Sequence, residues 1–218
     1  ETILYIYAVS LLNIKKYNEA EKVFKELLRT DKENYEVLTE LGDLYYSTGN
    51  IEKAEEFLEK SIKINPYNPK AYYILTEIYR IQGKKEKVLN SLEILTKLVP
   101  DDFYPYYLKG MLFKEIKNYK IADENFQKAY LILKNKTDFL SLFNIGIICI
   151  EMGKIDEALD VFLKLNSMKP ENVEVMNEIA VCYAMKGEKK KAKEIWEKIL
   201  LKNPDYYPAI ENLKKLKF

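Results

Sequence analysis

The sequence predicts an all-α fold, a solenoid of stacked helix pairs. The first observation behind this prediction is a skeleton of Gly, a small apolar residue five positions on, and Pro twelve positions after that, which recurs along the chain. The second is the spacing of apolar residues at three or four positions, as a helix requires, with breaks near the Gly and near the Pro. Each period is therefore expected to hold two helices. The skeleton occurs as Gly49, Ala54 and Pro66, as Gly83, Val88 and Pro100, as Gly153, Ala158 and Pro170, and as Gly187, Ala192 and Pro204.

The period over residues 35–68 shows how one helix pair is specified. Gly42 on the first helix and Ala54 on the second carry little or no side chain, so we expect the two backbones to approach closely there. Larger apolar side chains fill the space around that contact. The faces expected to meet carry Leu38, Leu41, Gly42 and Tyr45 on the first helix, and Ala54, Phe57, Leu58, Ser61 and Ile62 on the second.

Turn residues mark the ends of these helices. Gly49 permits the turn between the two helices, and Pro66 follows the end of the second. Asn68 is a suitable N-cap for the next first helix, and Pro69 suits the first position of that helix.

This pattern closely resembles the tetratricopeptide repeat, whose 34-residue signature runs aromatic, Leu-Gly, Tyr, Ala, Phe and Pro. The resemblance implies a right-handed α-α superhelical solenoid of six repeats followed by a C-terminal capping helix. The repeats cover residues 1–34, 35–68, 69–102, 103–138, 139–172 and 173–206, and the capping helix covers residues 207–218. In chain order the signature positions hold Leu4, Tyr7, Ala8, Leu11, Ala20 and Phe24; Leu38, Leu41, Gly42, Tyr45, Ala54, Leu58 and Pro66; Tyr72, Leu75, Thr76, Tyr79, Val88, Leu92 and Pro100; Tyr106, Gly110, Phe113, Ala122 and Phe126; Leu142, Ile145, Gly146, Cys149, Ala158, Phe162 and Pro170; and Met176, Ile179, Ala180, Tyr183, Ala192, Trp196 and Pro204.

Some positions depart from the signature. Lys32 and Lys134 replace the expected Pro, and Lys109 stands where an apolar residue is expected. A two-residue insertion, Thr137 and Asp138, ends the repeat over residues 103–138 and predicts a longer turn there. The capping helix sets four polar residues beside three apolar ones, as a terminal element needs for solubility. These are Glu211, Lys214, Lys215 and Lys217 beside Ile210, Leu213 and Leu216.

Composition argues against several functions. The chain has 35 Lys and Arg against 34 Asp and Glu, so no overall field attracts nucleic acid. Histidine is absent, which removes the commonest proton shuttle and metal ligand. No window of about eighteen apolar residues predicts a membrane span. We therefore expect neither an enzyme nor a cofactor or metal site.

Two cysteines, Cys149 and Cys182, lie in apolar helical stretches and are expected to be buried free thiols, as in a reducing compartment such as the cytoplasm; a disulfide between them is the less favoured alternative. The chain opens at Glu1 rather than Met, from which we expect a fragment or a trimmed product whose signal or anchor could have been lost.

Relatives in the tetratricopeptide family bind extended or helical peptides on the concave stripe of the first helices. Here that stripe is polar and acidic early in the chain and apolar in the fourth and fifth repeats, which predicts a partner protein or peptide with an apolar or aromatic anchor. Only Lys70 fits the pattern by which some relatives clamp an acidic C-terminal tail, which argues against that ligand. The predicted groove residues are Tyr73, Glu77, Arg80, Tyr104, Tyr107, Met111, Leu140, Phe143, Ile147, Ile150 and Asn177.

Three functions are consistent with this sequence. The favoured one is a non-catalytic scaffold that recruits a partner protein through the groove. The second is a self-assembling structural module, hence a homo-oligomer, in which the end helix or the apolar patch of one copy docks on another. The third is the regulatory array of a larger enzyme or transcription regulator. A simpler interpretation of the apolar stripe is that tighter winding of the superhelix, or the protein's own tail, covers it.

Overall fold

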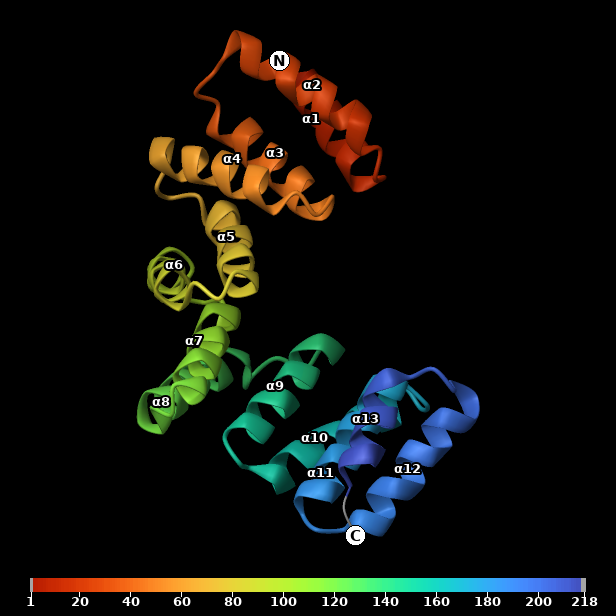
Figure 1. The fold of residues 1–218 in the computed structure, drawn as a ribbon. Coiled ribbons are helices and arrows are strands. Elements are labelled where there is room, and N and C mark those ends of the chain that lie inside the picture. Colours follow the sequence, from red (N-terminus) through yellow and green to blue (C-terminus); the bar gives the residue numbers. More distant parts are fainter. Residues whose placement is uncertain (1, 217–218) are drawn as a thin grey trace. The chain divides into compact units, whose positions relative to one another are not determined.

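The computed structural model describes residues 2–216, and these form thirteen α-helices and no strand (Figure 1). Glu1, which opens the first predicted repeat, and Lys217 and Phe218, which end the predicted cap, lie outside the described residues. The prediction of an all-α helical repeat solenoid is confirmed. The chain divides into two compact units, Glu1–Asp101 and Asp102–Phe218, and each is described by itself.

Unit 1 holds three helix pairs. Within each pair the two helices pack side by side, and the second helix of a pair also packs on the first helix of the next. Its buried core is apolar, with Phe24, Leu41, Leu58, Leu75 and Leu92 almost fully enclosed. Its helices are α1 (Thr2–Asn13), α2 (Tyr17–Thr30), α3 (Tyr35–Ser47), α4 (Ile51–Ile64), α5 (Pro69–Ile81) and α6 (Lys85–Leu98).

Unit 2 repeats this plan and ends on a single helix, α13, which packs on α12 and α11. Its core is one apolar cluster across α8 to α11 and a smaller one around Trp196 where α13 docks. Its helices are α7 (Phe103–Glu115), α8 (Tyr119–Leu133), α9 (Phe139–Glu151), α10 (Ile155–Met168), α11 (Val173–Met185), α12 (Lys189–Lys202) and α13 (Tyr207–Lys215).

Capping and turn residues determine where the helices begin and end. The first helices α3, α5, α7, α9 and α11 each follow an Asn or Asp whose side chain accepts a hydrogen bond from a backbone N–H of the first turn. The turns inside pairs need a left-handed residue: Gly153 has φ 73°, while Lys15 and Lys117 adopt φ 60° and 62°. The two-residue insertion at Thr137 and Asp138 is divided between a helix and a turn. The helix α8 is one residue longer than the other second helices, and the turn that follows α8 is one residue longer than the turns after those helices.

The glycines on the first helices leave room for a large side chain of the second helix. At Gly42 the side chain of Leu58, rather than the backbone near Ala54, takes the space where a Cβ would lie. The same holds at Gly146, where a Cβ would lie 2.5 Å from Cζ of Phe162. The missing side chain therefore admits a large residue of the second helix against the first helix.

Candidate partner-binding surface

The predicted groove residues of unit 2 lie on α7 and α9, except Asn177, which lies on α11. Asp102 begins α7 by accepting a hydrogen bond from the Tyr104 backbone N–H at 3.0 Å, and Asp138 begins α9 by accepting one from that of Ser141 at 2.9 Å. This bond with Ser141 lowers the pKa of Asp138. A spacing of three or four residues along each helix then places the predicted side chains on one stripe. We call the following residues the apolar surface: Tyr104, Tyr107 and Met111 on α7, and Leu140, Phe143, Ile147 and Ile150 on α9.

Two aromatic rings of the apolar surface rest on buried phenylalanines. The Tyr107 ring lies 6.0 Å from that of Phe126, and the Phe143 ring meets that of Phe162 edge-on at 5.6 Å. Phe126 and Phe162 are the side chains that occupy the space left by the glycines of their first helices. The buried rings therefore pack against the core-facing sides of Tyr107 and Phe143 and hold them in place, while both residues stay partly exposed.

The other members of the apolar surface differ in how far they are exposed to solvent. Leu140 is 68% exposed and Met111 is 38% exposed, while Ile147 and Ile150 are half-buried against the core. Lys114 of α7 pairs with Glu151 of α9 at 2.8 Å, which ties the two helices together near their C-terminal ends. The result is an apolar area beside an ion pair, suited to apolar side chains rather than to charged groups.

Asn177, which the sequence analysis placed in the groove, is instead 5% exposed. Its side-chain oxygen accepts hydrogen bonds from the Trp196 indole at 3.0 Å and from the Asn212 amide at 3.2 Å. Asn212 belongs to α13, so the docking of the last helix brings a polar partner to Asn177 and covers it. Asn177 is therefore a structural residue, and a partner could not reach it without moving α13.

An apolar hollow of about 440 Å³ lies beside this network, between α11, α12 and α13. Its charged lining residues are Lys189 and Lys215. The sequence analysis did not single it out, because its walls come from three helices whose packing no local signal predicts. The lining residues are Val181, Ala184, Met185, Lys189, Trp196, Asn212, Lys215 and Leu216.

The remaining predicted groove residues, Tyr73, Glu77 and Arg80, belong to α5 of unit 1. Arg80 donates two hydrogen bonds to the Glu77 carboxylate, the shorter at 2.8 Å, so the two charges largely satisfy each other. Tyr73 is half-buried. These residues offer a neutral, polar face, unlike the apolar surface of unit 2.

Unit 1 also contains a polar network that the sequence analysis missed. Lys70 of α5 contacts Glu40 at 2.7 Å and Asp43 at 2.9 Å on α3, and the Tyr5 hydroxyl of α1 donates to Glu40 at 3.4 Å. Burial by itself would lower the pKa of Lys70, but the hydrogen bonds to the two carboxylates raise it. Burial and the neighbouring Glu40 raise the pKa of Tyr5 to about 12. Glu40 and Lys70 lie thirty residues apart in the sequence, so no local signal predicts that they meet.

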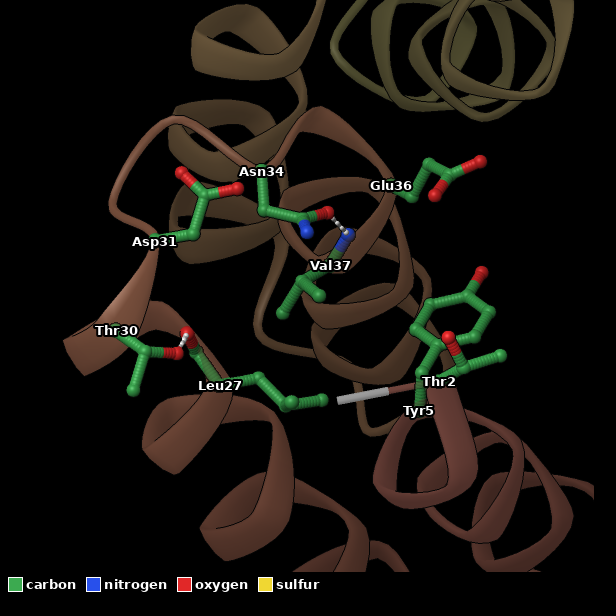
Figure 2. Close-up of a pocket in the computed structure, with 8 residues that line it drawn as sticks. All are labelled: Thr2, Tyr5, Leu27, Thr30, Asp31, Asn34, Glu36 and Val37. Atoms are coloured by element: carbon green, nitrogen blue, oxygen red, sulfur yellow. Dashed lines mark hydrogen bonds between the residues drawn. The ribbon is translucent and has the colours of Figure 1, made fainter.

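Beside this network a hollow of about 180 Å³ opens between α1, α2 and α3 (Figure 2). Tyr5 and Thr2 line one side, and Leu27 extends from α2 toward them. The Asn34 side-chain oxygen already accepts a hydrogen bond from the Val37 backbone N–H at 3.0 Å. Figure 2 shows the Asp31 and Glu36 carboxylates near the rim, so this hollow favours a cation or a hydrogen-bond donor over an anion.

Catalytic features are not apparent in the described residues. From Thr2 to Leu216, Cys, Asp and Glu side chains form no group of three that could hold a metal ion. Cys149 and Cys182 are free and buried, and burial raises their pKa values to about 11 and about 12. None of the helices described between these limits combines the length and apolar character that a membrane span needs.

Comparison with known proteins agrees with the repeat pattern. A family model of the tetratricopeptide repeat matches residues 15–64 and 150–216, which is more than half of the 218 residues, and a second model of this repeat matches residues 104–132. The chain belongs to the tetratricopeptide repeat family. Members of this family are generally non-catalytic scaffolds for protein–protein contacts, which is the coarse function that the fold supports.

Individual relatives are distant. A TPR repeat-containing protein of Methanocaldococcus jannaschii is 27% identical over 167 residues, covering 57% of this chain and 29% of the relative. A tetratricopeptide repeat protein from Parabacteroides merdae superposes with a TM-score of 0.70 at 22% identity, covering 99% of this chain and 91% of that one. YrrB, a TPR protein with an unusual peptide-binding site, gives a TM-score of 0.60 at 22% identity, covering 88% and 97%. The matched part of the chain covers 15–37% of the length of these and the other curated relatives compared.

Proposed function

We propose that this tetratricopeptide repeat protein is a non-catalytic scaffold whose unit 2 binds an amphipathic helix or an apolar peptide of a partner protein on the apolar surface. The observation that carries the proposal is Leu140, a large apolar side chain that is 68% exposed among other partly exposed apolar residues. Burying these side chains against a partner would release bound water, and the aromatic rings would supply fixed anchors.

The chemistry of the surface favours an apolar anchor over a charged one. Tyr107 and Phe143 rest on buried rings, so little conformational freedom is lost when a partner packs on them. The ion pair between Lys114 and Glu151 leaves the charges beside the surface balanced. A helix with apolar residues at intervals of three and four would match side chains that themselves repeat at that interval on α7 and α9.

The relatives support the general role. YrrB carries a peptide-binding site on a related fold, although at 22% identity the likeness concerns the fold alone. The proposal includes a reducing compartment, since the two thiols are buried and unpaired in the described structure. A second proposed role is that of the regulatory array of a larger enzyme or transcription regulator. It is compatible with the finding that the chain spans only part of the length of its relatives.

Screening a displayed library of amphipathic helical peptides against the protein tests the proposal. The tightest peptide is labelled with fluorescein, and its dissociation constant is measured by fluorescence anisotropy for the parent and for variants. Leu140→Lys and Met111→Lys change exposed side chains, so the fold should persist while binding weakens by about tenfold or more. Phe143→Ala should weaken binding as well, with circular dichroism as the check on folding.

Leu201→Lys is the matched control, because Leu201 of α12 is 85% exposed and lies outside the apolar surface. We expect it to bind like the parent. Equal binding by Leu140→Lys, Met111→Lys and the parent would contradict the proposed surface. A library that yields no binder at all would contradict the peptide-binding role.

A further inference from the structure

A second hollow in unit 1, of about 260 Å³, opens between α1, α3 and the turn that leads into α5. Tyrosines from three elements line it: Tyr5 of α1, Tyr35 at the start of α3, and Tyr67 in that turn. Tyr67 is 75% exposed, so its ring can be reached from solvent. Tyr5 and Glu36 also line the first hollow, where Figure 2 shows both side chains extending to the same side. Aromatic side chains and a carboxylate thus share the second hollow.

The charged groups around this second hollow are mostly acidic. Glu36 and Glu40 line it together with Lys70. The Lys70 ammonium group contacts Glu40 at 2.7 Å and Asp43 at 2.9 Å, so its charge is balanced locally. Burial first, and then the charges of Glu40 and Glu36, raise the pKa of Tyr5 to about 12, so this ring lies within the field of the carboxylates. Three carboxylates beside one ammonium group leave a net negative charge, which favours a cation.

Most polar side chains of the second hollow already have hydrogen-bond partners. The Asn68 amide donates to the Thr39 hydroxyl at 2.7 Å, and the Asn65 side-chain oxygen accepts from a backbone N–H at 3.0 Å. Glu40 is bonded within the polar network described above. The Glu36 carboxylate is exposed, and within residues 2–216 it makes no hydrogen bond or ion pair. A cation with N–H groups would therefore find few acceptors here, whereas a cation without N–H groups needs none.

A quaternary ammonium group fits these conditions. It has no N–H groups and, unlike the strongly hydrated ammonium group of lysine, loses no strong hydrogen bonds to water when it enters aromatic surroundings. The faces of tyrosine rings carry negative charge and attract such a cation, and a neighbouring carboxylate adds to the attraction. The volume of about 260 Å³ is below the range of pockets that take drug-sized ligands, which suits a trimethylammonium group rather than a larger molecule.

We propose that the second hollow binds a quaternary ammonium group, carried either by a small molecule such as choline or by a trimethylated lysine of another protein. Tyr5, Tyr35 and Tyr67 contact the methyl groups, and the Glu36 carboxylate balances the charge. The site belongs to unit 1, whereas the apolar surface belongs to unit 2, so the inference goes beyond the proposed peptide binding.

Titration of the protein followed by NMR tests the binding. Choline is compared with its neutral isostere, in which a carbon atom replaces the ammonium nitrogen. We expect saturable shifts with choline and a dissociation constant at least about tenfold higher for the isostere, because the isostere carries no charge. Equal binding of the two compounds would overturn the proposal. The absence of saturable shifts with choline up to about 50 mM would overturn it as well.

Substitutions of exposed lining residues locate the site. Tyr67→Ala and Glu36→Gln change exposed side chains, so the fold should persist, and each should weaken choline binding by about threefold to fivefold. Tyr67→Trp should bind at least as tightly as the parent, because Trp is the best aromatic partner of a cation. The matched controls are Tyr207→Ala, at 68% exposure on α13, and Glu52→Gln, in the first turn of α4 as Glu36 is in that of α3. Both controls should bind like the parent, and equal binding by Tyr67→Ala, Glu36→Gln and the parent would overturn the proposal.

Two peptides identify the source of the ammonium group. They share one sequence and differ only in carrying trimethyllysine or unmodified lysine. Tighter binding of the trimethylated peptide than of choline would assign the group to a partner protein, and tighter binding of choline would assign it to a small molecule; either result supports the proposal. An unmodified peptide that binds as tightly as the tighter of those two ligands would overturn it, because the hollow would then accept any cation.

Discussion

Replacing Asn177 by Leu tests how the last helix is held. Its side-chain oxygen accepts hydrogen bonds from the Trp196 indole at 3.0 Å and from the Asn212 amide at 3.2 Å. Leu has the same branched skeleton of side-chain heavy atoms but no acceptor, so the buried indole N–H loses its partner. Asn212 is only partly buried and can turn its amide toward water.

The expected loss of stability follows from the burial of Trp196, which is 2% exposed. A buried donor left without an acceptor costs about 1–3 kcal/mol. Since m-values in urea are about 1–3 kcal/mol per M for small units, the unfolding midpoint should fall by roughly 1 M.

Trp196 is the only tryptophan in the chain, so its fluorescence reports unfolding of this region directly. Urea unfolding is followed by tryptophan emission for the parent, Asn177→Leu and Asn212→Ala. Asn212→Ala removes the weaker, partly exposed bond and keeps the indole bond, so it should cost under about 1 kcal/mol.

An unchanged midpoint for Asn177→Leu would refute the reasoning, since it would mean that the indole bond contributes nothing. A larger loss for Asn212→Ala than for Asn177→Leu would also refute it, because the docking of α13 rather than the indole bond would then dominate. In a Trp196→Phe background, followed by circular dichroism, Asn177→Leu should cost less than it does in the parent, because no indole donor then remains to be left unsatisfied.

Three further outcomes are expected. Gly153→Ala should lower the thermal stability by about 1 kcal/mol and Lys117→Gly should raise it by a similar amount, because both positions have a left-handed φ (73° and 62°); equal melting temperatures for both variants and the parent would contradict this. Phe162→Ala should cost about 3–5 kcal/mol in urea unfolding, whereas Leu140→Ala, at 68% exposure, should change stability by about 0.5 kcal/mol or less. Glu55 is partly buried, which by itself raises its pKa, but hydrogen bonds from Gln82, Lys84 and Lys87 hold the pKa at about 2, below the ordinary 4.5. The stability that the Glu55 carboxylate contributes is thus present above about pH 4.5 and is lost as the pH falls toward 2. In thermal melts Glu55→Gln should lose less stability than the parent over that window, with a difference under about 1 kcal/mol because both lysines are nearly half exposed. Identical pH profiles for the variant and the parent would argue against this contribution.

Much of the fold could be predicted from local signals. The starts of α3 and α7 at Tyr35 and Phe103 follow from Asn34 and Asp102, whose side chains cap the helices that come directly after them. The turn at Gly153 follows from the freedom of glycine at positive φ. These features depend on residues within a few positions of one another, so the amino-acid order is sufficient to predict them.

Packing partners could not be predicted in this way. Lys70 contacts Glu40 thirty residues away, and Phe162 occupies the space left by Gly146 from another helix. Asn177 was predicted at the surface because its position on α11 belongs to the stripe that is exposed on α9, and the docking of α13 buried it.

The sequence by itself determined that this protein is an array of helix pairs, where most of the helices begin, and which faces are apolar, because capping, turn conformation and apolar periodicity are properties of neighbouring residues. Only the tertiary structure decided which side chains fill the glycine gaps, which charges pair and which apolar side chains remain exposed. Those outcomes depend on distances of a few ångströms between helices that are far apart in the chain, and these distances are set by the packing of whole helices.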